Sequence, residues 1–132
     1  LARPGRMFIE TAKYHMWDYE DGLKSLLHQH SPGFWFTYYL GLDRVIDLYR
    51  EFLGAETHAQ SKMWDYLFSR RFLWAHQMEP FPDRHFIGMV RLCMSAKEMD
   101  EASRRFSRLV AHVQKRMGGF KIDGWRFRSK AD

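Results

Sequence analysis

The sequence has 132 residues, of which 45% are apolar and 28% are charged, a length and composition typical of one folded domain and not of a disordered chain. No stretch approaches the roughly 20 apolar residues that cross a bilayer, and the single cysteine, Cys93, excludes an internal disulfide and a cysteine-based zinc site. The net charge of +5 favours acidic neighbours: nucleic acid, anionic lipid headgroups or an acidic protein surface. We expect that the protein resides in a reducing compartment and has no secretory signal. Because the sequence begins at Leu1 and not at methionine, we expect that a targeting segment was removed or that the sequence was trimmed.

Helical periodicity extends over most of the chain. Apolar residues at three- and four-residue intervals predict amphipathic helices over 42–53, 64–78, 84–96 and 99–116. Breaks are expected at the Pro and Gly positions between them, which are Pro32, Gly33, Gly54, Pro80, Pro82, Gly118 and Gly119. Alternation of period two is absent over any useful length, so we predict an all-α fold.

A short motif occurs twice. Met16-Trp17-Asp18-Tyr19 recurs as Met63-Trp64-Asp65-Tyr66. Each copy precedes a proline-containing break, then a helix, and then an amphipathic helix that begins with an acidic residue, at Leu42-Asp43 and at Met99-Asp100. This shared order indicates a duplicated helical unit.

Residues 83–116 resemble a pentatricopeptide or tetratricopeptide hairpin. Ala102 and Phe106 stand where such repeats place a small residue and an aromatic residue at the helix crossing. We therefore predict a short right-handed α-solenoid of such hairpins in a single domain over residues 1–117, followed by an extended basic and aromatic tail over 118–132. Two or three hairpins cannot cover their own faces, which implies a partner.

A more specific resemblance covers residues 62–117. This stretch contains, in order, Trp64, a helix to Met78, two prolines at 80 and 82, Arg91-Leu92-Cys93, and Lys97 through Phe106. This order of features is similar to that of the central hairpins of the cytochrome c oxidase subunit Va family, called subunit VI in yeast. The resemblance implies a nuclear-encoded accessory subunit on the matrix side of the mitochondrial inner membrane that carries no haem or copper. Two departures are that the family continues with further C-terminal helices, and that residues 1–42 match no family pattern.

Catalytic, cofactor-binding and metal-binding residues are not predicted. His28 and His30 are two residues apart and would lie on different faces of a helix. Cys93 lies within an apolar helical pattern, where a thiol acts as a small hydrophobic group. Asp18 and Asp65 need only the helix dipole to explain them, and the glycines form no phosphate-binding loop.

Aromatic residues make up 17% of the chain. Trp64, Phe68, Phe72 and Phe106 lie in apolar helical patterns and are expected in the core. Three consecutive rings cannot all face one core from one helix, so Phe34, Trp35 and Phe36 are candidates for a partner-binding surface. The tail supplies three further candidates, which are Trp125, Arg126 and Arg128.

The sequence is consistent with two functions. The first is a structural or assembly subunit of mitochondrial cytochrome c oxidase or a related respiratory-chain complex, bound to other subunits of that complex. The alternative is a pentatricopeptide-like RNA-binding protein or a mitochondrial ribosomal subunit, favoured by the positive charge and by basic residues near the end: Lys115, Arg116, Lys121, Arg126, Arg128 and Lys130. An enzyme ranks third.

Overall fold

The computed structural model describes residues 4–56 and 60–123. This part of the chain contains six α-helices and no strand, which confirms the all-helical prediction. The helices are α1 (Arg6–His28), α2 (Gly33–Leu53), α3 (Gln60–Phe68), α4 (Arg70–Ala75), α5 (Arg84–Met94) and α6 (Met99–Arg116).

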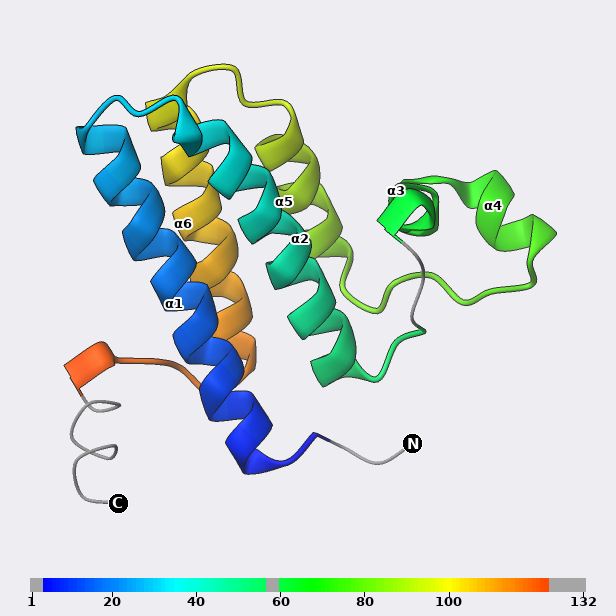
Figure 1. Ribbon diagram of the computed structural model, residues 1–132. Coiled ribbons are helices and arrows are strands. Elements are labelled where there is room, and N and C mark those ends of the chain that lie inside the picture. Colours follow the sequence, from blue (N-terminus) through cyan, green and yellow to red (C-terminus); the bar gives the residue numbers. More distant parts are fainter. Residues whose placement is uncertain (1–3, 57–59, 124–132) are drawn as a thin grey trace.

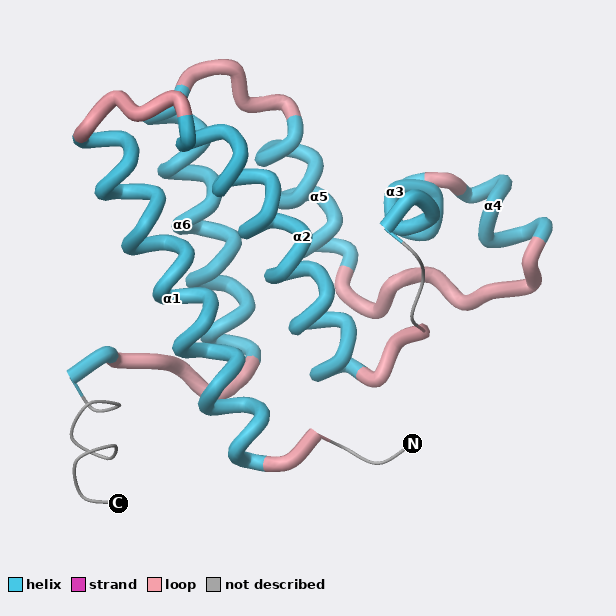
Figure 2. Tube along the Cα trace, viewed as in Figure 1, coloured by secondary structure: helices cyan, strands magenta, loops and turns pink. Residues whose placement is uncertain are grey.

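Four of these helices form a bundle. α1 and α2 are neighbours, and α6 lies against α1, α2 and α5 (Figure 1). The short helices α3 and α4 form an arm beside the bundle. A long loop over residues 76–83 connects this arm to α5 (Figure 2).

The solenoid arrangement is not confirmed. In a solenoid each hairpin contacts only its neighbours along the chain. Here the first helix of the described chain lies against the last one. Buried Lys13 of α1 joins the two, because its Nζ donates a 2.9 Å hydrogen bond to the carbonyl oxygen of Gly119, and the Gln114 side chain donates back to the Lys13 carbonyl at 3.1 Å.

The hairpin of α5 and α6 is the best-predicted part of the fold. Asp83 caps α5, since its carboxylate accepts the backbone N–H of Phe86 at 3.0 Å. α6 begins at Met99 as predicted, with acidic residues in its first turn and basic residues in its last turn. α5 ends at Met94, two residues before the predicted end.

α2 is one continuous helix, which corrects the expectation of a separate helix starting at Leu42. Gly41 continues the helix and leaves room for neighbouring side chains of α6 and α1, since a Cβ on Gly41 would lie 3.0 Å from Cζ of Phe106 and 3.1 Å from Cδ1 of Tyr19. Phe106 is fully buried, as predicted, and its ring centroid lies 6.0 Å from that of Tyr38 on α2.

The predicted helix over 64–78 is two short helices. Ser69 adopts an extended backbone conformation, and its hydroxyl accepts the N–H of Phe72, so that it caps α4 and ends α3. α4 then stops at Ala75, five residues before Pro80.

The two copies of the Met-Trp-Asp-Tyr motif are not structurally equivalent. The first lies within the 23-residue helix α1 of the bundle and buries Met16 completely. The second lies in the nine-residue helix α3 of the arm and buries Tyr66 instead. Trp64 is 50% exposed, so the expectation that it lies in the core is wrong.

Candidate functional site

Three large apolar side chains are exposed together near the start of α2. Phe36 is 71% exposed, Tyr39 44% and Leu40 45%. Their spacing of three and four residues places them on one helical face, opposite to the face that Tyr38, Leu42 and Val45 bury. Burial of such side chains is worth about 1.5–3 kcal/mol each, so their joint exposure favours contact with another molecule.

The same residues line a shallow depression. Trp35, Phe36, Tyr39, Leu40 and Asp43 surround a volume of about 410 Å³. The rings of Trp35 and Tyr39 are stacked, with centroids 6.1 Å apart and planes at 26°. We call Trp35, Phe36, Tyr39 and Leu40 the α2 aromatic surface.

The first of the three consecutive rings does not belong to this surface. Phe34 is fully buried and stacks on Tyr38 at a centroid distance of 5.8 Å. Its expected partner-binding role is therefore corrected, because a buried ring is not accessible to a partner. Trp35 is partly buried against the core, and Phe36 is the most exposed of the three.

Sequence reasoning missed Tyr39 and Leu40. The signal was present: once α2 is taken as one helix from Gly33, Phe34, Tyr38, Leu42, Val45 and Tyr49 form its apolar stripe, and positions 36, 39, 40 and 43 fall on the opposite side. The other three candidates, Trp125, Arg126 and Arg128, lie outside the described residues.

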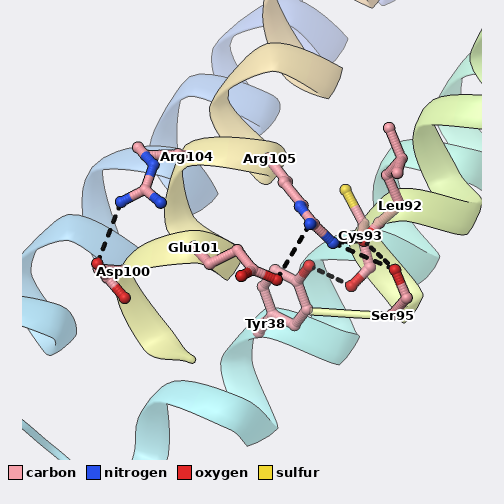
Figure 3. A network of polar contacts seen from close by, with 8 residues as sticks. All are labelled: Tyr38, Leu92, Cys93, Ser95, Asp100, Glu101, Arg104 and Arg105. Atoms are coloured by element: carbon pink, nitrogen blue, oxygen red, sulfur yellow. Dashed lines mark hydrogen bonds and ion pairs between the residues drawn. The ribbon is translucent and has the colours of Figure 1, made fainter. Parts of the chain in front are cut away.

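A polar network surrounds Cys93. The Tyr38 hydroxyl donates a 2.6 Å hydrogen bond to the Cys93 carbonyl oxygen, and Arg105 donates to the Leu92 carbonyl oxygen at 2.6 Å (Figure 3). Burial raises the pKa of the Cys93 thiol to about 11 and raises that of Tyr38 well above its ordinary value. The thiol is therefore protonated at neutral pH and acts as a core side chain.

A second network lies at the other end of the α5–α6 hairpin. Asp83 accepts hydrogen bonds from the Tyr49 hydroxyl and from Nε2 of His112, the latter at 2.8 Å. Arg116 donates to the Tyr49 oxygen at 3.2 Å. Burial by itself would raise the pKa of Asp83, but the bonds from Tyr49, His112 and the Phe86 N–H outweigh it and lower the pKa to about 2. The carboxylate thus joins α2, α5 and α6, and each of its two oxygens accepts at least one hydrogen bond.

The arm is attached through aromatic contacts. The guanidinium of Arg91 on α5 lies 4.7 Å from the ring centroid of Phe68 on α3. The ring of Tyr66 on α3 lies 6.2 Å from that of Phe81, which in turn lies 5.9 Å from that of Tyr49 on α2. Trp74 on α4 is 83% exposed. Leu73, Trp74 and Met78 line a second hollow there, with a volume of about 480 Å³.

Residues 4–56 and 60–123 contain no group of three or more His, Cys, Asp or Glu side chains that could hold a metal ion. None of the helices in these ranges is long and apolar enough to cross a membrane.

Comparison of the chain with protein-family models, with curated proteins and with solved structures returned no match.

Proposed function

We propose that this protein is a non-catalytic subunit that docks on a larger assembly through the α2 aromatic surface. The observation that carries the proposal is the joint exposure of Phe36, Tyr39 and Leu40 on one face of a helix whose other face is fully packed. Exposed aromatic residues next to a well-ordered core are typical of protein interfaces, where they supply most of the binding energy.

The polar networks support the same role. The carboxylate of Asp83 and the hydroxyl of Tyr38 both bond to other elements of the bundle. Cys93, the single thiol of the chain, is buried and protonated. The Asp83 carboxylate and the Tyr38 hydroxyl hold helices together, which suits a rigid docking module.

The assembly we propose is mitochondrial cytochrome c oxidase or a related respiratory-chain complex, on the matrix side of the inner membrane. This part of the proposal rests on the resemblance of residues 62–117 to the subunit Va family. In that setting the subunit contributes interface burial and carries no haem or copper.

The docking surface is tested by removing its apolar area. Phe36→Ser with Leu40→Ser should release the chain from high-molecular-weight complexes in gentle detergent extracts, measured by size-exclusion chromatography of a tagged chain. The matched control is Met7→Ser with Trp74→Ser, because these side chains are 82% and 83% exposed but lie elsewhere. Retention of the Phe36/Leu40 variant, or equal release of the control, would argue against docking through α2.

A further inference from the structure

Positive charge is concentrated in the second part of the chain. Residues 1–82 contain nine Lys and Arg and ten Asp and Glu, whereas residues 83–116 contain eight Lys and Arg and only four Asp and Glu. The α5–α6 hairpin therefore has a net charge of +4, against −1 for everything before it. Such asymmetry is typical of chains that bind a polyanion.

The charges of α6 lie along its solvent side. Arg104, Arg108 and Lys115 are exposed and share one helical face with Ala111, while the buried side holds Phe106, Leu109, Val110 and Val113. From Arg104 to Lys115 the row extends about 17 Å at 1.5 Å per residue. That length spans about five phosphates of one duplex strand.

Part of this charge has no counterion among the described residues. Arg104 and Arg105 pair with Asp100 and Glu101, at 3.1 Å and 3.2 Å (Figure 3). Arg108 and Lys115, in contrast, have no ion pair with any residue of the described chain.

Exposed cations continue onto α5. The rings of His85 and His112 meet at 5.0 Å, so the exposed side of α5 adjoins the row on α6. Arg84 lies next to His85, is exposed, and likewise has no ion pair with a described residue. We call Arg84, His85, Arg108, His112, Lys115 and Arg116 the basic face.

We propose that the basic face binds the phosphate backbone of a nucleic acid, without sequence readout. A membrane surface fits less well, because helices that lie in a bilayer interface expose large apolar side chains beside their cations. On α6 the largest exposed apolar residue is an alanine, Ala111. On α5 the exposed large apolar side chains are Leu92 and Met94, and both lie at the C-terminal end of the helix. The proposal is independent of docking through α2, which uses a different helix.

The test compares two neutralised variants of the full chain. Arg108→Gln with Lys115→Gln removes two charges from the basic face, and Lys62→Gln with Arg71→Gln removes two exposed charges from the arm as the matched control. Binding is measured by fluorescence anisotropy with a labelled single-stranded RNA of about 20 nucleotides and with RNA and DNA duplexes of similar length, over a range of salt concentrations. Co-sedimentation with phosphatidylcholine vesicles containing phosphatidylserine is the lipid arm, and circular dichroism checks that each variant is folded.

We expect the Arg108/Lys115 variant to bind single-stranded RNA roughly tenfold more weakly near 0.1 M salt, with a slope of log K against log salt about 1.4 smaller in magnitude. The control should stay within about twofold with an unchanged slope. Equal weakening of both variants would overturn the proposal, because net charge alone would then explain binding. Absence of nucleic-acid binding, or binding to the vesicles alone, would overturn it as well.

Discussion

Lys13 of α1 donates a 2.9 Å hydrogen bond to the carbonyl oxygen of Gly119, 106 residues further along the chain. The same buried ammonium lies 3.4 Å from the Met117 carbonyl and 3.1 Å from Glu10. It therefore satisfies carbonyl groups beyond the end of α6 and holds the last helix against the first.

Replacing Lys13 by methionine keeps the apolar stem and removes the charge. We expect the free energy of unfolding to fall by about 1–3 kcal/mol, because the carbonyl groups of buried Met117 and of Gly119 lose their donor. Lys24→Met is the control, since the Lys24 side chain is 61% exposed and should change stability by less than about 0.5 kcal/mol. Urea denaturation measures both. A Lys13→Met protein as stable as the parent would contradict this role.

Gly41 and Gly88 form a matched pair of helical glycines. Gly41→Ala should destabilise the protein by about 1 kcal/mol, because overpacking against buried Phe106 costs about 1–3 kcal/mol and exceeds the gain in helix propensity. Gly88→Ala should stabilise it by up to about 1 kcal/mol, because a Cβ there meets nothing within 4 Å. Thermal denaturation decides the signs, and a stabilising Gly41→Ala would disprove the close approach of α6 to α2.

The lowered pKa of Asp83 predicts that the stability of the protein depends on pH. Its pKa is lowered from 3.8 to about 2 in the folded protein, so the ionised form contributes stability that is present above the unfolded-state pKa and is lost as the pH falls through the folded-state value. Between about pH 5 and pH 2 the parent should lose roughly 1–2 kcal/mol more than Asp83→Asn, which keeps a capping side chain without the charge. Denaturant unfolding at a series of pH values tests this. Parallel curves for the two proteins would show that Asp83 is not responsible.

The hairpin of α5 and α6 could be predicted because its signals are local. Asp83 stands at the N-cap, the acidic residues of α6 come first and the basic residues last, and the apolar positions repeat with helical spacing. None of these signals depends on the rest of the chain.

The features that sequence reasoning missed depend on contacts between distant segments. A helix was expected to begin at Leu42, yet the helix continues through Gly41, and Gly41 is the point where Phe106 approaches α2. The packing of α1 against α6 is stabilised by buried Lys13, and a lysine in a sequence gives no sign that it will be buried. Ser69 did carry a local signal, since serine is a common N-cap, but the apolar pattern on both sides of it concealed the break.

The candidate surface was predicted in part. Phe36 was named and is exposed, whereas Phe34 was named and is buried. The difference depends on which residues lie on the buried face of α2 and which lie on its exposed face. These faces can be assigned correctly only if the helix is taken to begin at Gly33 and not at Leu42.

The docking proposal is tested most directly by co-migration. A tagged chain, extracted in mild detergent from cells that make it, is run on a native gel and probed together with cytochrome c oxidase subunits. We expect the chain to migrate with assembled oxidase, and Phe36→Ser with Leu40→Ser to abolish the co-migration. A chain that never migrates with the oxidase, whether it migrates alone or with the ribosome, would contradict the docking proposal.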